Sequence, residues 1–367
     1  MIFRLKNVAN RLMGTGPVAV QPFDALYPAR ASGAYDGGQA LDNFTGVLAT
    51  VPGDQCAYPR LQSLLGGPAE SDALFVGTSA DRRLFTLPDA CVAGGDGVVY
   101  DPKRRIAVEE TVRSWLRPPS EHPLLAAPRF PAACPLPGVT LSLASLGAEG
   151  FYHFLLESLP RLALARPWLD RVDHVLAPGQ AGRFQENWLS LAGVPREKII
   201  WLEGHSHFRC DQLLFTGPLS QDSQPTPWLV STVRETVSAV PPVRGTRKLW
   251  ISRNDAGVRH VAWEGELLSR LPEFEHVELA ARPPAGQIAL LGSAAVVAGP
   301  HGAGLANLVF CPAGASIVEL QPAHCNRPLF GRLASAAGCR HAWTTVDFAR
   351  PPENLPALAG AIRAFAA

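Results

Sequence analysis

Apolar and polar positions change their period several times along the chain. Short apolar runs predict buried strands at 139–145, 174–179 and 198–204, and the apolar spacing between them predicts helices at 152–165 and 184–194. An alternation of buried strands and amphipathic helices is typical of a parallel sheet that is covered on both faces. This part of the chain therefore predicts an α/β unit.

A second alternation follows a proline-rich break. Residues 224–247 contain a helical segment and then the adjacent prolines Pro241 and Pro242, which we interpret as a linker. Beyond the linker the pattern predicts strands and then a closing helix. The strands are expected at 248–253, 276–280, 295–299 and 316–320, with helices at 264–271, 285–294, 301–310, 332–338 and 353–367.

The length of 367 residues exceeds the usual size of one hydrophobic core, so we expect two main domains. Open parallel sheets bind ligands at the carboxyl ends of their strands, and two such domains would face a cleft. The expected organisation is a strand- and loop-rich region at 1–137, Rossmann-like domains at 138–240 and 246–350, and a C-terminal helix at 351–367.

Composition narrows the class of protein. The chain is 47% hydrophobic and 18% charged, which is typical of packed domains, and a net charge of +1 gives no indication of a nucleic-acid partner. Seven scattered cysteines make a poor disulfide framework, so we expect a cytoplasmic location. No apolar stretch reaches the roughly 18–20 residues of a membrane span. Residues 1–14 are either an ordinary N-terminal segment or an amphipathic helix on the inner face of a membrane.

The stretch "VVAGPHGAGLANLVF" at 296–310 predicts a strand, a tight turn and the start of a helix. A helix start offers unpaired N–H groups and a partial positive charge to a phosphate, and glycines let the phosphate approach the backbone. We therefore expect His301, Gly302, Ala303 and Gly304 to line a nucleotide site, with His301 donating to a phosphate oxygen or a leaving group.

Charged side chains are expected beside this turn. Arg253 and Arg259 follow the strand that contains "LWIS", and the planar guanidinium group suits a phosphate. Glu319 ends the strand after the glycine turn, where an acid can accept from ribose hydroxyls. Solvated surface positions are the alternative for all three. Asn307 replaces the third glycine of the dinucleotide pattern, so the turn indicates a nucleotide without specifying which one.

The first α/β unit offers a candidate general base. His153 and Glu157 are four residues apart on a predicted helix and share one face. Either group facing a cleft can take a proton from an acceptor hydroxyl. The alternative is a structural pairing within the domain, with Arg161 available to Glu157 four residues further on.

We expect no metal ion. The chain contains no Asp-x-Asp pair of the kind that holds a metal–diphosphate. Zinc is a weaker alternative, because "HSHFRC" at 205–210 and the pairs His324/Cys325 and Cys339/His341 match no standard ligand spacing.

Three blocks resemble glycosyltransferase family 61 in the family's own order. They are "YHFLLESLPRL", "KLWISRNDAGVRHVAWEGEL" and "AAVVAGPHGAGLANLVFCPAGASIVELQP". The resemblance covers roughly residues 139–325 and is most specific at 247–322. Trp263 departs from the family, which usually has Asn before the acid at Glu264, and this leaves the turn and the choice of donor open.

The resemblance implies a GT-B-like fold with an acceptor domain and a donor domain, and an inverting transfer that needs no metal. It implies a nucleotide sugar, with a UDP-sugar as the first expectation, and a glycan or lipid-linked glycan acceptor in bacterial capsular or surface polysaccharide synthesis. By position, Arg253 and Arg259 would hold the diphosphate, the turn at 301–304 would line the donor pocket, and Glu157 would be the family's upstream acid.

Two other classes of function remain open. An NAD(P)-dependent oxidoreductase would use the glycine turn at 299–307, although the first unit shows no clear dinucleotide site. A module that only binds a nucleotide or glycan would retain binding without His153 or Glu157.

Overall fold

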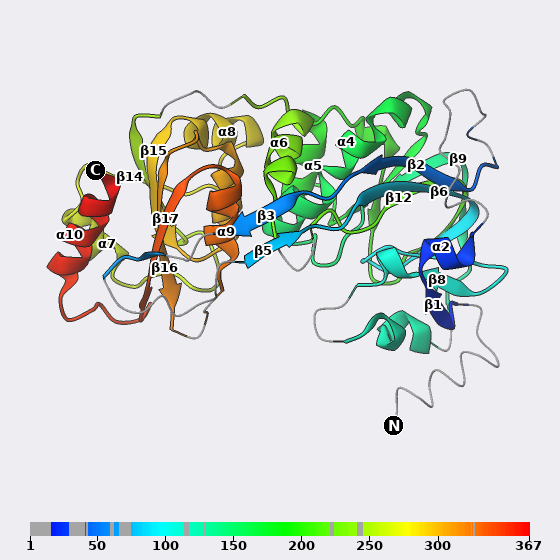
Figure 1. Ribbon diagram of the computed structural model, residues 1–367, viewed down its shortest axis with the longest axis horizontal. Helices are drawn as coiled ribbons and strands as arrows, with labels where there is room; N and C mark the ends of the chain where they lie inside the picture. The colour runs from blue at the N-terminus through cyan, green and yellow to red at the C-terminus, as the bar shows by residue number, and fades with distance from the viewer. Residues whose placement is uncertain are drawn as a thin grey trace. The chain divides into compact units, whose positions relative to one another are not determined.

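The structure is a computed structural model, shown in Figure 1, and it describes most of the chain. The described residues are 16–28, 41, 43–58, 62–65, 75–113, 117–127, 130–220, 224–240, 245–323, 325 and 327–367. The candidate amphipathic segment at 1–14 lies outside the described residues. So does His324, which belongs to the weaker zinc alternative.

The chain forms two compact units. One is drawn from Met1–Gly53 and Ala80–Leu219, and the other from Asp54–Ser79 and Ser220–Ala367. Each unit is α/β and contains parallel strands, which confirms the predicted fold class at that level. The units do not follow the predicted borders, because each incorporates strands from the region at 1–137.

The first unit has a nine-stranded mixed sheet in the order β1-β8-β7-β6-β12-β9-β10-β11, with β2 also paired to β6. Strands β12, β9, β10 and β11 are parallel, whereas β6 pairs antiparallel with β12. The strands are β1 (Ala19–Gln21), β2 (Gly46–Val51), β6 (Arg82–Ala93), β7 (Val98–Asp101), β8 (Ile106–Val108), β9 (Cys134–Ser142), β10 (His174–Pro178), β11 (Ile199–Leu202) and β12 (His207–Thr216).

The long strand β6 is the main departure from the sequence-based expectation for this unit. We expected only loops and short strands before residue 138, yet β6 is twelve residues long and is paired along most of its length with β12. Its side chains Phe85, Leu87 and Val92 are buried in the main core of the unit. Pairing with β12, which is distant in sequence, therefore stabilises β6 as a strand although the sequence of β6 shows no clear alternation of apolar and polar residues.

Short helices complete the first unit. They are α2 (Phe23–Leu26), α3 (Phe151–His153), the π-helix η4 (Phe154–Ser158), α4 (Arg161–Ala165) and α5 (Phe184–Leu191), with 3-10 turns η1 (Glu109–Thr111), η2 (Pro119–Glu121), η3 (Pro123–Ala126), η5 (Arg166–Arg171) and η6 (Arg196–Lys198).

The second unit has a six-stranded, wholly parallel sheet in the order β14-β13-β15-β16-β17-β4. All seven residues of β16 are buried, as expected for a central strand covered on both faces. The strands are β4 (Gln62–Ser63), β13 (Arg247–Ile251), β14 (Glu275–Val277), β15 (Ala294–Pro300), β16 (Ser316–Pro322) and β17 (Arg340–Val346), and β3 (Gln55–Tyr58) pairs with β5 (Phe75–Thr78) in a separate ribbon.

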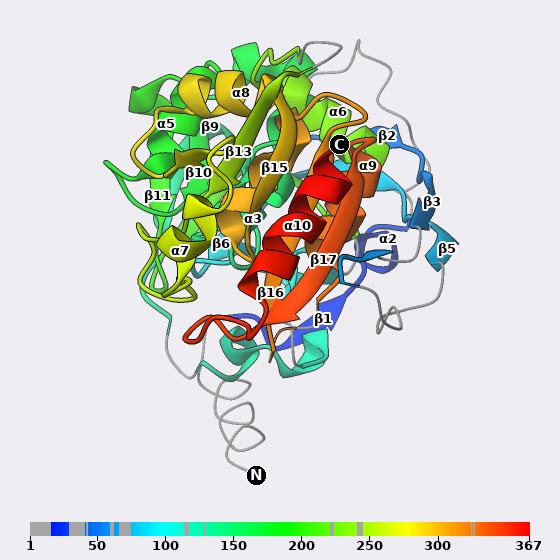
Figure 2. The ribbon, with the colours of Figure 1, turned by 90° about the vertical axis from the view of Figure 1, so that its left-hand side faces the viewer.

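Helices cover both faces of this parallel sheet (Figures 1 and 2). On one face α10 and α7 pack over a core that contains Trp250, Val318 and Ile362. On the other face α8 contacts β15 and α9 contacts β17. The helices are α6 (Pro227–Thr236), α7 (Glu264–Ser269), α8 (Pro284–Gly292), the 3-10 helix η7 (Ala303–Phe310), α9 (Leu329–Ala336) and α10 (Leu355–Ala366).

Most predicted elements of the second unit are present, with three differences. The segment after the glycine turn is a 3-10 helix, and neither β17 nor β4 was predicted. Strand β4 has two residues and completes the sheet edge by pairing with Ala342 and Trp343 of β17. A two-residue strand has no period that the sequence can display.

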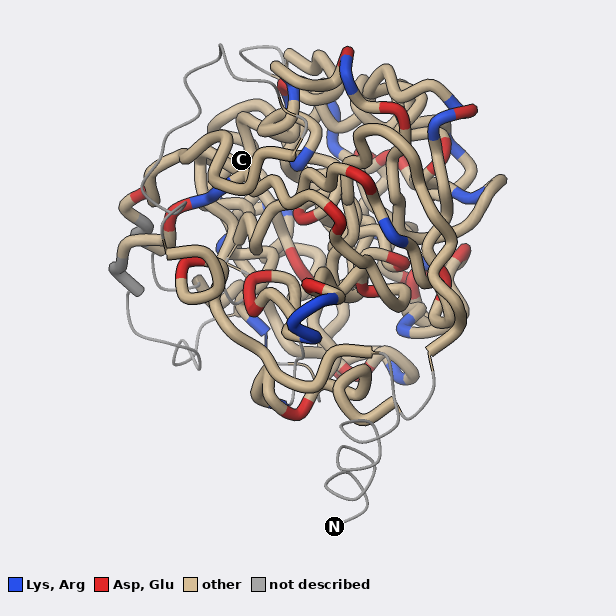
Figure 3. Tube along the Cα trace, turned by 90° about the vertical axis from the view of Figure 1, so that its right-hand side faces the viewer, with Lys and Arg blue, Asp and Glu red and all other residues tan. Residues whose placement is uncertain are grey.

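Basic and acidic residues are interspersed along the chain in Figure 3, in keeping with the net charge of +1. Within the part of the chain that the structure describes, none of the helices combines the length and the apolar character that a membrane span requires.

Candidate functional site

Arg253 lies against the glycine turn at the carboxyl end of β13. A Cβ atom at Gly302 would stand 1.7 Å from Nη1 and 2.5 Å from Cζ of Arg253, so the guanidinium group packs directly on the Gly302 Cα. At Gly304 a Cβ would meet only Ile251 and Leu279, at an ordinary 3.5 Å. The space that the sequence assigned to a ligand at Gly302 is therefore occupied by the guanidinium group of Arg253.

The Arg253 guanidinium has few protein partners. Its Nη2 donates to the carbonyl oxygen of Val258 at 3.1 Å, and its buried Nε has no acceptor among the described residues. Burial lowers the pKa of Arg253, and the nearby charge of Arg259 lowers it further against the opposing influence of Asp255. A cation that is desolvated beside a like charge is an energetically unfavourable arrangement that an oxyanion would relieve.

Arg259 and Val258 lie on the exposed turn that follows Arg253. Arg259 has a φ of 59°, in the left-handed region that non-glycine residues rarely adopt. Val258 is 61% exposed despite its apolar side chain. Backbone strain and an exposed apolar group on one short turn are typical of a segment that meets a ligand.

A buried carboxylate holds the base of this turn. Glu264, at the start of α7, is 3% exposed and accepts hydrogen bonds from four side chains. The donors are Trp250 Nε1 at 2.8 Å, Ser252 Oγ at 2.6 Å, Asn254 Nδ2 at 3.1 Å and His276 Nε2 at 3.0 Å. Because Ser252 and Asn254 flank Arg253, Glu264 positions that arginine. The sequence marked Glu264 only as the acid after Trp263.

Trp263 itself faces away from the ligand-binding turn. It is 5% exposed and donates from Nε1 to the carbonyl oxygen of Asp347 at 2.9 Å. It also belongs to the core cluster under α10 and α7. The tryptophan that departs from the family pattern at this position is therefore part of the hydrophobic core.

A second buried carboxylate joins two histidines. Glu319 is fully buried, and its two oxygens lie 2.5 Å from Nδ1 of His301 and 3.0 Å from Nε2 of His341. An ionised carboxylate only accepts hydrogen bonds, so both of these ring nitrogens carry protons. The ring of His301 also packs edge-on against Phe330, at 5.0 Å between centroids.

Glu319 therefore orients histidines in this structure and offers no exposed face to a ribose, the contact that the sequence suggested. Burial by itself raises the pKa of Glu319, but the hydrogen bonds from His301 and His341 outweigh it, and the pKa lies below the ordinary value. The carboxylate is consequently ionised at neutral pH. His341 is the residue of this cluster that sequence reasoning missed, because its strand β17 was not predicted.

Asn307, at the position of the third glycine, has a structural role. Its Nδ2 donates to Gln287 Oε1 at 3.1 Å and to the carbonyl oxygen of Gly304 at 3.2 Å. These bonds tie η7 to α8 and fix the geometry of the turn. Ala303 is the first residue of η7, and Gly302 occupies the N-cap position before it.

The first unit brings His153 and Glu157 together, as their spacing predicts. His153 Nδ1 lies 3.3 Å from Glu157 Oε1, and Ser145 Oγ donates to Glu157 Oε2 at 3.1 Å. Both side chains are partly exposed, at 23% for His153 and 17% for Glu157. The pair therefore has an accessible carboxylate whose two oxygens are held by neighbours.

The helix that carries Glu157 is interrupted. Leu159 N donates to Phe154 O, a bond to the fifth residue back that defines a π-turn, and Pro160 has no N–H to continue the helix. Arg161 fills the gap, because its Nε donates to the Glu157 carbonyl oxygen at 2.8 Å and its Nη1 to Thr216 O at 3.1 Å. Such π-turns are frequent at functional sites.

Arg161 thus binds the main chain of Glu157, and the Glu157 carboxylate has Ser145 and His153 as its partners. Burial lowers the pKa of Arg161 to about 10, with the charge of Glu157 opposing that shift. The structural pairing that the sequence offered as an alternative is therefore present, but through the main chain. Among the described residues no group of three metal-ligating side chains occurs.

We expect Gly302→Ala to weaken the binding of a nucleoside diphosphate such as UDP by roughly tenfold or more, because the new methyl group displaces the Arg253 guanidinium. The unfolding temperature should change little, since the far end of an arginine can swing away. Gly304→Ala is the matched control and should retain binding. Isothermal titration calorimetry measures both, and equal affinities in the two variants would contradict the proposed contact.

Glu264→Gln should lower the free energy of unfolding by about 2–4 kcal/mol, because an amide cannot accept from four donors as a carboxylate does. Affinity for UDP should fall as the Arg253 turn loosens. Glu266→Gln on the same helix removes an exposed charge and should have little effect. Urea unfolding tests the pair of variants, and similar stabilities would refute this role for Glu264.

The depressed pKa of Glu319 predicts a specific pH dependence. Its ionised form contributes stability above the unfolded-state pKa of about 4.5, and this contribution is lost as the pH falls through the lower folded-state value. The difference in unfolding free energy between the wild type and Glu319→Gln should be greatest above about pH 5 and should shrink on acidification. Urea titrations across this range measure it. A difference that grows at low pH would rule out the ionised carboxylate.

A comparison with protein families gives a match, and it covers candidate residues of both units. Residues 151–318 match the model of the family described as Glycosyltransferase 61. The matched range contains His153 and Glu157 as well as Arg253, Arg259 and His301. None of the curated proteins compared with the chain matched it. Residues 151–318 are therefore similar to glycosyltransferase family 61, which supports a glycosyltransferase.

Proposed function

We propose that the protein is an inverting, metal-independent glycosyltransferase that moves a sugar from a nucleotide sugar, a UDP-sugar in the first instance, to a hydroxyl of a glycan or lipid-linked glycan. The observation that carries the proposal is the half-buried guanidinium of Arg253 on Gly302, whose buried Nε has no acceptor among the described residues. A diphosphate supplies the oxyanion that this group lacks. The second unit is the donor domain in this proposal and the first unit is the acceptor domain, in a GT-B-like arrangement.

The reaction is a single displacement. The acceptor hydroxyl attacks the anomeric carbon of the donor, a new C–O bond forms, and the bond to the diphosphate breaks. Glu157 takes the hydroxyl proton, because its carboxylate is accessible and is held by Ser145 and His153. His153 is the alternative base.

Negative charge grows on the departing diphosphate during this step. Arg253 and Arg259 then interact with it more strongly than with the intact donor, and His301 is held at the turn by the contact of its Nδ1 with Glu319. Interactions that strengthen as charge develops lower the activation barrier. The donors are fixed in advance by the Glu264 and Glu319 carboxylates, so they need little reorganisation.

We further propose a role in surface polysaccharide synthesis, with the protein in the cytoplasm and peripherally associated with the inner face of a membrane. This proposal rests on the sequence of the N-terminal segment and on the family resemblance. A protein found wholly in the soluble fraction after gentle lysis would contradict the membrane association.

Two alternative functions differ in what they bind and in what they turn over. An NAD(P)-dependent oxidoreductase would be stabilised by NAD or NADP and not by a nucleoside diphosphate. A module that only binds would show nucleotide binding with no transfer. Neither alternative is favoured, because Asn307 holds the turn by hydrogen bonds at the position where the dinucleotide pattern has its third glycine.

The decisive experiment compares thermal shifts with UDP, GDP, CMP, dTDP and NAD for the wild type, Arg253→Ala and Glu157→Gln. A ligand at a hundredfold excess over its dissociation constant adds about 2.7 kcal/mol of apparent stability. We expect stabilisation by one nucleoside phosphate, lost in Arg253→Ala and kept in Glu157→Gln. Transfer to an acceptor mixture should fall by about 10²–10⁴ in Glu157→Gln. Stabilisation by NAD alone would favour the oxidoreductase, and unchanged transfer in Glu157→Gln would exclude this base.

A further inference from the structure

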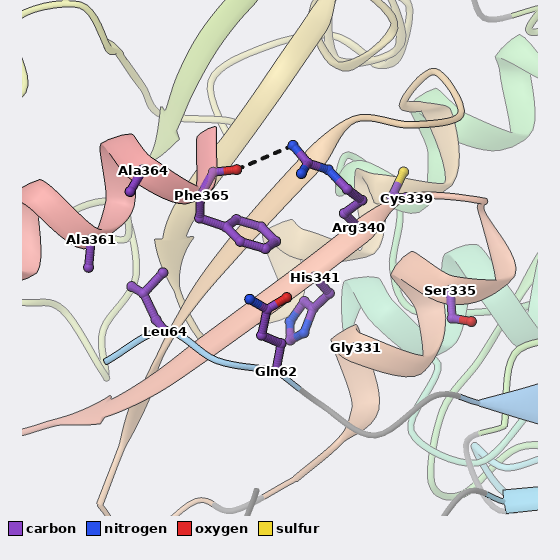
Figure 4. A pocket seen from close by; sticks show the side chains of 10 residues that line it. All are labelled: Gln62, Leu64, Gly331, Ser335, Cys339, Arg340, His341, Ala361, Ala364 and Phe365. Carbon is purple, nitrogen blue, oxygen red and sulfur yellow. Dashed lines mark hydrogen bonds between the residues drawn. The ribbon is translucent and has the colours of Figure 1, made fainter. Parts of the chain in front are cut away.

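A pocket of about 590 Å³ lies at the β17–β4 edge of the second unit (Figure 4). None of the residues assigned to the donor diphosphate lines it. Its lining comes from β4 and the turn after it, α9, β17 and α10, at Gln62, Leu64, Gly331, Ser335, Cys339, Arg340, His341, Ala361, Ala364 and Phe365. The volume is in the range of small-molecule sites and exceeds what a single inorganic anion fills.

The pocket carries positive charge without an acidic counterpart. Arg340 is held by hydrogen bonds from Nη2 to Ser316 Oγ and to the carbonyl oxygen of Phe365, and its Cζ lies 5.2 Å from the centre of the Phe365 ring. These partners are neutral. No aspartate or glutamate occurs among the described residues that line the pocket. A ligand with a carboxylate would complement this guanidinium group.

His341 adds an unused polar atom to the pocket wall. Its side chain is only 5% exposed, and Nε2 is committed to Glu319 at 3.0 Å. Its Nδ1 is buried and has no hydrogen-bond partner within the described parts of the chain. A buried polar atom without a partner is costly, and a ligand hydroxyl or carboxyl group in this pocket would satisfy it.

The remaining walls suit a ring with both polar and apolar faces. Phe365, Leu64 and the small side chains of α10 supply apolar surface, whereas Gln62 and Ser335 supply an amide and a hydroxyl (Figure 4). A pyranose has C–H groups that pack on an aromatic ring and hydroxyls that bond to such side chains. Cys339 is not a reactive group here, because burial raises its pKa to about 11.

We propose that this pocket is a second binding site, which takes a sugar unit that carries a carboxylate, of the uronic acid class. Arg340 binds the carboxylate, His341 Nδ1 bonds to a hydroxyl, and the ring packs on Phe365. The site is separate from the Arg253 turn and does not depend on the donor chemistry proposed above. Glu319 links the two places, because it binds His301 and His341 at once.

The test is a titration of the full chain with glucuronate, glucose and acetate, followed by calorimetry or ligand-observed NMR. We expect glucuronate to bind at least tenfold more tightly than glucose or acetate. Arg340→Gln and Ala364→Trp should each weaken glucuronate binding at least tenfold, the first by removing the charge and the second by filling the pocket from an exposed position. Arg350→Gln is the matched control, since it removes an exposed charge that does not line the pocket.

Unfolding temperatures of the variants show that a loss of binding is not a loss of folding, and Ala364→Trp provides a second variant if Arg340→Gln is unstable. Absence of glucuronate binding in the wild type would overturn the proposal. So would binding that survives both pocket variants. Binding that is lost in Arg253→Ala but retained in Arg340→Gln would place the ligand at the other turn, which also overturns the proposal, and UDP binding reports on that turn independently.

Discussion

A buried charge has to be surrounded by groups that stabilise it, and this constraint shapes the second unit. Glu264 gathers four donors from β13, the turn after it and β14. Glu319 gathers His301 and His341 from the neighbouring strands. Side chains of the protein therefore supply the hydrogen bonds that these two buried carboxylates need. Arg253 differs from these two acids and thereby identifies the candidate site, because it is partly desolvated and no acidic group among the described residues is in contact with it.

The parallel sheet makes these arrangements compatible. Strands β13, β15 and β16 are adjacent and parallel, so their carboxyl ends lie at one edge of the sheet. Arg253 follows β13, and His301 follows β15, where its backbone N–H donates to Leu320 of β16 at 2.7 Å. Groups from distant parts of the sequence thus reach one region without any long connecting loop. The glycine at 302 allows the arginine to lie across the turn.

In the first unit the candidate carboxylate, that of Glu157, lies on a helix that is interrupted at Pro160. The main-chain oxygen of Glu157 near this helix end needs a hydrogen-bond donor. Arg161 supplies that donor from its side chain, and its other end binds Thr216 of β12. The interruption is therefore tied to the sheet, and the Glu157 carboxylate keeps its own partners, Ser145 and His153. The pairing of Glu157 with Arg161 within the domain, which the sequence offered as an alternative, is thus made through the main chain of Glu157.

The sequence by itself determined the local features of this protein. The alternation of periods predicted most strands and helices of the second unit, and the i, i+4 spacing predicted the contact of His153 with Glu157, because both depend on residues close along the chain. The tertiary structure alone decided the long strand β6, the edge strand β4, the donors around Glu264 and the shared carboxylate of Glu319. Strand β17 was not predicted, although residues 343–346 are β-branched or aromatic and suit a strand, and nothing in the sequence pointed to its link with Glu319. Each of these features joins residues that are far apart in sequence, and such pairs form only when the sheet brings them together.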